Sequence, residues 1–233
     1  MKNIVNILRV SEQGVSRPYV CEDETRAVRW CKGNHSGIRA VICEWICAWI
    51  AARMELPVPE PAILRLDAAT FGDWRKNRNA EAPVLVTAAN PYVFGSLNVE
   101  NIKDVFLPDE ELKHIDADMF AKIYMFDRLV HNTDRTDVNS NLLVNGSVYI
   151  IDHNNAFDPD FNVADFAKEH ILREYYRKCD MEVRSAFRTT VAERINGRFI
   201  DEVWSEMPEE WTELGSDLIP PEKIKAVLED FSV

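Results

Sequence analysis

The chain has 233 residues, of which 46% are hydrophobic and 28% charged, and this ordinary globular composition allows one large domain or two small lobes. The net charge of −12 and the pI near 4.9 argue against nucleic-acid binding, because an acidic surface repels phosphates and no run of Lys and Arg exceeds two residues. No stretch approaches the roughly 18 apolar residues of a membrane span, so we expect no membrane partner.

Strands and one helix are predicted for the N-terminal part. Strand patterns cover residues 3–10 and 26–31. A helix follows from residue 38, where apolar residues recur at helical spacing until the prolines of "ELPVPEP" end the pattern. The remaining predictions for this part are a strand at residues 62–67, a polar loop, a strand at residues 83–88 and an irregular connector at residues 90–97.

The cysteines are expected to be reduced. The five cysteines include no Cys-x-x-Cys pair, which predicts free thiols and a cytoplasmic protein. Cys43 and Cys47 lie four residues apart on the predicted helix and are expected to pack as small apolar side chains. A zinc site formed by these two cysteines and His35 is the alternative, although no second ligand pair stands at a usual spacing.

The remainder of the chain has mainly helical patterns. A helix is predicted at residues 108–130, opened by acidic residues that suit a helix N-terminus, and three or four more helices at residues 163–231. One hairpin interrupts these helices, so the whole pattern predicts an α+β fold with two unequal lobes. We expect a β-rich N-terminal lobe at residues 1–97 and a helical C-terminal lobe at residues 98–233.

The hairpin brings two polar residues together. Asn145-Gly146 stands between apolar β-formers, which is the strongest short-range signal for a two-residue type I′ turn. Such a turn would pair Asn139 with Asp152 at the open end, with Cβ atoms roughly 5 Å apart. An amide oxygen and a carboxylate at that separation can hold a hard cation such as Mg²⁺.

Two alternatives compete with a metal site at this hairpin. Asn and Asp are common at strand ends, so a solvated hairpin mouth explains the same residues. A calcium loop is suggested by "DVNSN", but the position that requires Gly holds Leu142 and the position that requires Glu holds Val148. Asp134 favours the metal site. Asn139 follows Asp134 by five residues, and Asp152 follows Asn139 by thirteen. The catalytic Asp and the two metal ligands of protein kinases have the same spacing.

The segment "FDRLVHNTDRTDVNSNLLV", followed by "VYIIDHNNAF", resembles the catalytic segment of the HipA-like kinase family. The resemblance implies a two-lobed protein-kinase-like fold, with a small β-rich N-lobe and a larger, mainly helical C-lobe that carries a catalytic β-hairpin. It implies Asp134 as the catalytic residue and Asn139 and Asp152 as ligands of Mg²⁺. It further implies that Lys32, at the end of a strand, binds the nucleotide phosphates and pairs with Glu44 on the next helix.

The family resemblance implies an ATP- and Mg²⁺-dependent phosphotransferase that acts on a hydroxyl acceptor, either a protein Ser or Thr or a small molecule. The alternative is a pseudokinase that binds nucleotide or a partner without turnover, which the lack of a Gly-x-Gly-x-x-Gly loop favours. The first 24 residues contain only Gly14, and the hydroxyl of Ser16 would have to help cover the phosphates instead. A nucleotidyl transferase on the same scaffold would use the same residues.

Overall fold

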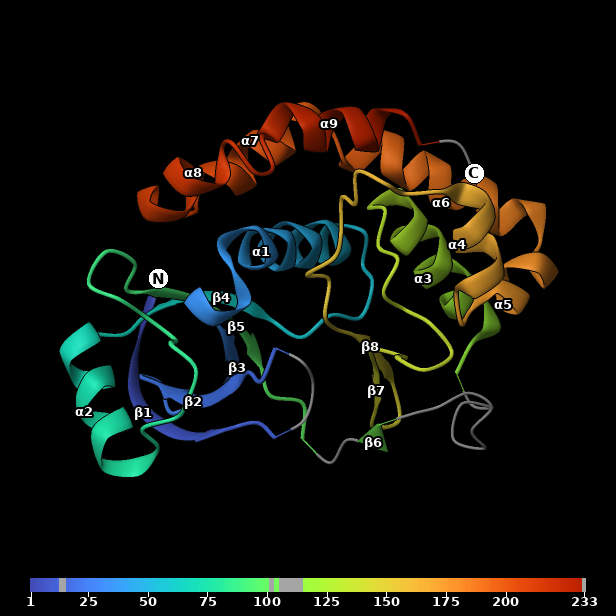
Figure 1. The fold of residues 1–233 in the computed structure, drawn as a ribbon. Coiled ribbons are helices and arrows are strands. Elements are labelled where there is room, and N and C mark those ends of the chain that lie inside the picture. The colour runs from blue at the N-terminus through green and yellow to red at the C-terminus, as the bar shows by residue number, and fades with distance from the viewer. Residues whose placement is uncertain (13–15, 101–102, 105–114, 232–233) are drawn as a thin grey trace.

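A closed β-barrel forms the N-terminal part of the molecule (Figure 1). The computed structural model describes residues 1–12, 16–100, 103–104 and 115–231. The barrel strands follow one another in the order β1, β2, β3, β5 and β4, and only the pairing of β1 with β4 is parallel. Their bounds are β1 Lys2–Val10, β2 Tyr19–Asp23, β3 Val28–Lys32, β4 Pro61–Arg65 and β5 Tyr92–Leu97.

Strand β5 corrects one prediction, because residues 92–97 were expected in an irregular connector and instead pair with both β3 and β4. Gly95 allows this pairing, since a Cβ atom at that position would lie 2.6 Å from the side chain of Leu64. The strand predicted at residues 83–88 is wrong. That segment has no strand structure and buries Leu85 and Val86 in the barrel core.

The polar loop predicted after β4 contains helix α2, Ala68–Arg78, which is a second correction. Asp67 caps this helix by accepting the backbone N–H of Thr70. The helix buries Phe71 in the barrel core, and Trp74 donates its indole N–H to the carbonyl of Ile7. Two aromatic side chains on one helical face therefore hold α2 against the barrel.

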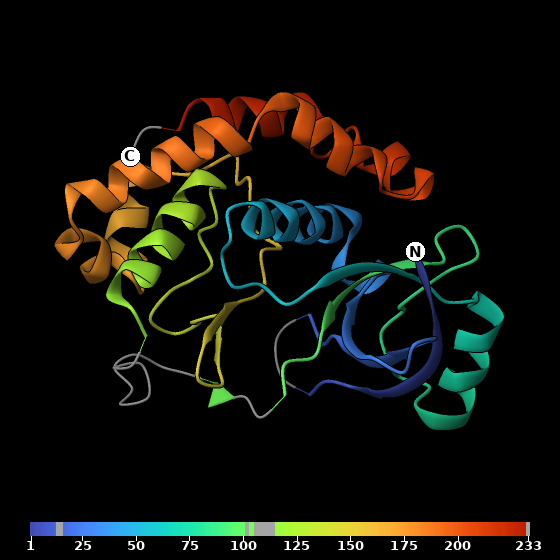
Figure 2. The same cartoon turned by 180° about the vertical axis from the view of Figure 1, so that it is seen from behind.

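Helix α1, Ile38–Arg53, forms as predicted and lies at the centre of the molecule. A 3-10 turn at Asn34–Ser36 leads into it. Its buried face contributes Ile42, Ile46 and Ile50 to the larger hydrophobic core. Figures 1 and 2 show α1 between the barrel and the row of C-terminal helices, and α1 contacts strands β4 and β5 as well as helices α7 and α8. The helix therefore joins the two parts of the fold.

The C-terminal part is mainly helical, as predicted, but it is divided more finely. Within residues 163–231, all of which are described, there are six helices rather than three or four. Helix α3, Ala117–Leu129, begins at the cap residue Asp116, and residues 108–114 of the helix predicted there lie outside the described residues. The C-terminal helices are α4 Val163–Glu169, α5 Arg173–Lys178, α6 Met181–Arg194, α7 Gly197–Ser205, α8 Glu209–Gly215 and α9 Pro221–Glu229.

The predicted hairpin exists, but its register differs from the prediction by one residue. Strands β7, Leu142–Val144, and β8, Val148–Ile150, pair antiparallel beside the short strand β6, Lys103–Asp104. Val144 pairs with Val148, so the turn contains three residues and the two-residue type I′ turn is wrong. The cause is burial, because this register places four apolar side chains of the two strands together on the core face. Those four are Leu142, Val144, Val148 and Ile150.

The mixed α+β class is therefore confirmed, while the division into lobes at residue 97 stays a prediction. Among the helices that the structure describes, none is long and apolar enough to cross a membrane. All five cysteines are free thiols. Cys43 and Cys47 are fully buried in the core beside apolar side chains, which is the packing role expected for them.

Candidate active site

Lys32 lies between two carboxylates that come from distant parts of the chain. Its Nζ atom is 2.5 Å from Oε1 of Glu44 on α1 and 2.7 Å from Oδ1 of Asp152, which follows β8. Glu44 also accepts the backbone N–H of His153 through Oε2, at 3.1 Å. The side chains of Lys32 and Glu44 are 10% and 5% exposed, whereas Asp152 is 27% exposed and can be reached from solvent.

The local sequence explains how Lys32 reaches this position. Lys32 is the last residue of β3, and the chain turns at Gly33 into helix α1. A Cβ atom at Gly33 would lie 2.3 Å from the carbonyl oxygen of Leu85, so only glycine fits this close approach of two backbones. The N–H of Asn34 donates to the same carbonyl at 2.9 Å. This contact fixes the turn that places Glu44 opposite Lys32.

The charges in this cluster are not balanced. Burial alone would lower the pKa of Lys32, but the carboxylates of Glu44 and Asp152 outweigh burial and raise that pKa well above its ordinary range. Burial raises the pKa of Glu44, while the Lys32 ammonium opposes it. For Asp152 the effect of Lys32 outweighs burial and lowers the pKa. One ammonium group therefore serves two carboxylates, of which Asp152 is the more exposed.

Asp134 lies in the loop before the hairpin and is held there by two asparagines. Nδ2 of Asn139 donates to the backbone carbonyl of Asp134 at 3.2 Å, and Nδ2 of Asn141 lies 3.5 Å from its carboxylate oxygen Oδ2. Burial raises the pKa of Asp134, the hydrogen bond from Asn139 opposes this, and the negative charge of Asp152 raises the pKa further.

Asn139 does not occupy the position predicted for it in the hairpin. Its backbone pairs with Thr136 in a tight turn, and the strand register does not place it opposite Asp152. The structure therefore brings Lys32, Glu44 and Asp152 into direct contact and joins Asp134 to Asn139. Sequence reasoning does not identify Asn141, although its place in the repeated pattern Asn-Ser-Asn is a visible signal.

The donors in this cluster fit a hard cation. Carboxylate and amide oxygens are the protein ligands that Mg²⁺ prefers, and Mg²⁺ usually takes one or two carboxylates together with substrate phosphates. Over the described ranges of the chain, no group of three or more His, Cys, Asp and Glu side chains is arranged to hold a metal ion. A cation here would therefore need three kinds of ligand, namely the carboxylate of Asp152, the amide oxygen of Asn139 and the phosphates of a bound nucleotide.

A buried ionic network lies behind the loop. Asp127 and Arg135 are fully buried, and Nε of Arg135 donates to Oδ2 of Asp127 at 2.6 Å. Asn132 and His170 also donate to the Asp127 carboxylate, at 2.8 and 3.0 Å. Burial would raise the pKa of Asp127, but the positive charge of Arg135 and the donor from His170 outweigh it and hold that pKa well below its usual range.

Arg135 links this network to both sides of the site. Its Nη1 atom donates to the backbone carbonyls of Ser140 and Asn141, at 3.1 and 2.5 Å, and these residues lead into β7. Its Nη2 atom lies 3.2 Å from Nε2 of His153, the residue after Asp152. Burial lowers the pKa of His153 to about 4, so its neutral ring accepts this hydrogen bond. Sequence reasoning misses Arg135, for which the Asp-Arg pair at 134–135 is the available signal.

Acid is expected to destabilise the fold through His170. Its Nε2–H donates to Asp127, and its Nδ1 accepts the backbone N–H of Leu172 at 3.1 Å, so the neutral ring uses both nitrogens. Burial lowers the pKa of His170 below the ordinary value of 6.5, although Asp127 opposes this. Because the unfolded chain then binds the proton at higher pH, the free energy of unfolding falls as the pH drops below about 6.5.

Denaturation curves recorded at about pH 7 and about pH 5 measure this loss of stability. The variant His170→Gln keeps an amide group that can donate to Asp127 but does not titrate, so its stability should depend less steeply on pH. An identical pH dependence in the variant and the wild type would contradict the assignment.

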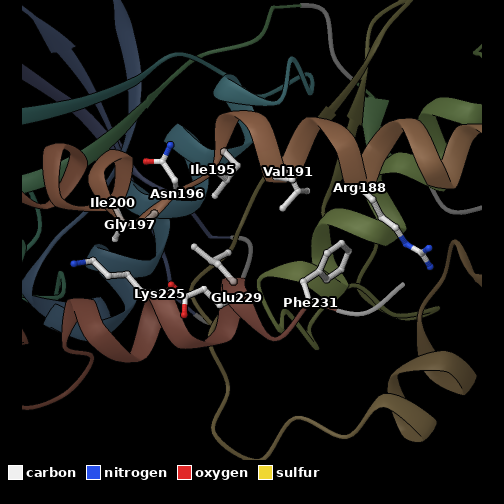
Figure 3. Close-up of a pocket in the computed structure, with 11 residues that line it drawn as sticks. Arg188, Val191, Ile195, Asn196, Gly197, Ile200, Lys225, Glu229 and Phe231 are labelled. Carbon is white, nitrogen blue, oxygen red and sulfur yellow. The ribbon is translucent and has the colours of Figure 1, made fainter.

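Two cavities lie away from the Lys32 cluster. A cavity of about 370 Å³ between α6, α7 and α9 is lined by side chains that include Val191, Ile195 and Lys225 (Figure 3), and by none of the predicted site residues. A recess of about 170 Å³ lies nearer the loop and includes Thr133, directly before Asp134. The first cavity is therefore not part of the candidate active site.

Solved structures show which fold this is. The crystal structure of a Helicobacter pylori proinflammatory kinase, CtkA, superposes with a TM-score of 0.57 at 13% sequence identity, over 98% of this chain and 91% of that chain. The FAT and kinase domain of CtTel1 gives a TM-score of 0.35 at 15% identity, over 96% of this chain and 21% of that chain, which is too low to support an argument. No curated protein matches the chain.

Sequence comparison identifies the family. The sequence model of the HipA-like kinases matches residues 4–232, nearly the entire chain. This range includes the barrel strand that ends in Lys32, the loop with Asp134 and the hairpin before Asp152. The kinase fold shared with CtkA agrees with this match. The chain therefore belongs to the HipA-like kinase family.

Proposed function

We propose that this chain is an ATP- and Mg²⁺-dependent phosphotransferase that transfers the γ-phosphoryl group to a hydroxyl acceptor. The observation that carries the proposal is the contact of Lys32 with both Glu44 and Asp152, at 2.5 and 2.7 Å. Phosphoryl transfer depends on positioning and charge stabilisation more than on covalent chemistry by the protein. A fixed ammonium group beside an accessible carboxylate supplies both the positioning and the charge stabilisation.

Lys32 and Glu44 act together in the proposed mechanism. Glu44 is buried and fixed by Lys32 and by the N–H of His153, so it holds the ammonium group at the end of β3. Lys32 would contact the phosphates of ATP as a point charge and stabilise the negative charge of the transferring group.

Asp152 and Asn139 are the proposed ligands of Mg²⁺. The amide nitrogen of Asn139 donates to Asp134, which leaves the amide oxygen as the atom that can bind a cation. Asp152 offers a carboxylate that remains partly exposed. When bound, Mg²⁺ would neutralise charge on the phosphates of the nucleotide.

Asp134 is the proposed catalytic base. Its carboxylate would accept the proton of the acceptor hydroxyl as the new O–P bond forms and the bond from the γ-phosphorus to the bridging oxygen of ADP breaks. The raised pKa of Asp134, caused mainly by burial, improves its ability to take up this proton. Asn141 would hold one oxygen of the carboxylate during this step.

The metal assignment is tested by titration calorimetry with ATP in the presence and absence of Mg²⁺. We expect the wild type to bind ATP at least about tenfold more tightly with Mg²⁺, a difference of ~1.4 kcal/mol. Asp152→Asn should lose this preference, because the neutral amide cannot balance the cation. Asp137→Asn is the matched control, since Asp137 is an exposed carboxylate in the loop before the hairpin and pairs with Arg173. Equal affinity of the wild type with and without Mg²⁺ would contradict the assignment.

The consumption of ATP distinguishes the phosphotransferase from the pseudokinase. A wild type that binds Mg²⁺-ATP but yields no ADP or phosphorylated product with any hydroxyl acceptor would act as a nucleotide-binding module. Mass analysis of the product, with a search for phosphate or adenylate, separates phosphoryl transfer from nucleotidyl transfer. Labelled ATP offered with protein and small-molecule fractions of a cell extract would identify the class of acceptor.

A further inference from the structure

The segment that follows β8 has a constrained backbone. Asp152 and Phe157 both have left-handed conformations, with φ of 60° and 55°. Such conformations cost about 1–3 kcal/mol each and persist only where the surroundings hold them. The position of the Asp152 carboxylate therefore depends on contacts that hold residues 152–157.

Helix α1 supplies these contacts through Arg39. Nη1 of Arg39 donates to the backbone carbonyl of Asn154 at 3.3 Å, and Nη2 donates to the carbonyls of Ala156 and Phe157 at 2.8 and 3.1 Å. Among the described residues, no carboxylate forms a salt bridge with Arg39. The guanidinium of Arg39 instead donates its hydrogen bonds to this segment.

The same helix holds the start of the segment as well. Glu44, just over one helical turn beyond Arg39, accepts the N–H of His153. Two side chains of α1 therefore contact the segment from His153 to Phe157. A planar guanidinium presents its donors in a rigid fork, which suits three carbonyls gathered at one place.

We infer that Arg39 is a positioning residue, which sets the position of Asp152 by holding the backbone that follows it. The inference rests on the proposed function, because the binding of Mg²⁺ by Asp152 is part of that proposal. Residues that orient a metal ligand typically change metal affinity about 10–100-fold when they are replaced. Arg39 itself touches neither nucleotide nor metal in this assignment.

The first experiment needs no nucleotide. Amide hydrogen exchange of Ala156 and Phe157, which donate to the carbonyls of His153 and Val130, reports opening of the segment. Arg39→Met should accelerate their exchange at least about tenfold, because three hydrogen bonds to the segment are lost. Arg53→Met is the matched control on the same helix, since Arg53 lies over the ring of Phe199 and should leave the exchange unchanged.

The second experiment is a Mg²⁺ titration of nucleotide binding. Arg39→Met should raise the Mg²⁺ concentration needed for half-maximal binding about tenfold and leave binding of metal-free ATP unchanged. Arg39→Lys should recover part of the loss, because an ammonium group keeps the charge but cannot reach all three carbonyls. A purely structural role would lower thermal stability without changing the Mg²⁺ requirement.

Two outcomes would overturn the inference. In the first, Arg39→Met has the same Mg²⁺ requirement and the same amide exchange as the wild type. In the second, Arg53→Met changes both quantities as much as Arg39→Met does, which would indicate general loosening of α1. If the wild type itself shows no preference for Mg²⁺, the proposed function fails. In that case the amide exchange data alone decide whether Arg39 holds the segment. Unchanged exchange in Arg39→Met would then show that Arg39 does not hold it.

Discussion

Asp134→Asn is expected to lower the rate of phosphoryl transfer about 10²–10⁴-fold, the usual contribution of a positioned general base. The substitution removes the proton acceptor but keeps the size and shape of the side chain. Binding of Mg²⁺-ATP should remain, because Lys32 contacts Glu44 and Asp152 rather than Asp134. Single-turnover kinetics with saturating Mg²⁺-ATP measure the rate, and calorimetry measures the binding.

The control for this loss of rate is Asp137→Asn, three residues further along the same loop. Asp137 pairs with Arg173 at 3.3 Å, and its side chain is 65% exposed, so its loss should leave the rate nearly unchanged. A transfer rate in Asp134→Asn equal to that of the wild type would show that Asp134 is not the base. Loss of nucleotide binding in the same variant would instead show that its main role is structural.

The largest expected effect on stability comes from Arg135→Met. The substitution leaves the Asp127 carboxylate fully buried without its main positive partner, and breaking a buried pair in this way costs about 3–5 kcal/mol. It also removes the donors to the carbonyls of Ser140 and Asn141, so the loop should become less ordered. Chemical denaturation followed by circular dichroism measures the free energy of unfolding.

Arg173→Met is the matched control for Arg135→Met. Asp137, the partner of Arg173, is 65% exposed, so the loss of this pair should cost less than about 1 kcal/mol. The double variant Asp127→Leu with Arg135→Met should be less destabilised than the sum of the single variants, because no unpaired charge remains buried. A cost below about 1 kcal/mol for Arg135→Met alone would contradict the view that the buried pair orders the loop.

Short-range signals in the sequence determined several features of this protein. The helical stripe that begins at residue 38 predicts α1, and Asn145-Gly146 between apolar residues predicts the hairpin of β7 and β8. The segment that contains Asp134, Asn139 and Asp152 resembles the HipA-like kinases, and the family model confirms this resemblance. These signals suffice because helical periodicity, turn chemistry and motif spacing depend only on residues close together in the chain.

The choice between two similar segments depended on the tertiary structure. The segments "PVLVTA" and "YVFGSL" both contain apolar β-formers, and strand propensity does not decide which of them joins the barrel. The place between β3 and β4 is taken by the second segment, in which Gly95 admits the side chain of Leu64. The first segment instead offers the carbonyl of Leu85 to the turn after Lys32.

The hairpin register was also decided by packing. A two-residue turn is the best local choice for Asn145-Gly146, yet the core requires Leu142 to face Ile150 and Val144 to face Val148. The burial of these four side chains outweighs the preference of the turn, so Ser147 joins the loop. In this register Asn139 does not lie opposite Asp152, and its side chain donates to the backbone carbonyl of Asp134.

The contacts of the candidate site are the features that the sequence by itself leaves open. Lys32 and Asp152 are 120 residues apart in the chain, and Asp127 and His170 are 43 residues apart. Residue types and the family resemblance indicate which groups are present, as the resemblance did for Lys32 and Glu44. Only the packing of α1 between the barrel and the C-terminal helices brings these groups within hydrogen-bonding distance, because such contacts depend on the whole core and not on neighbouring residues.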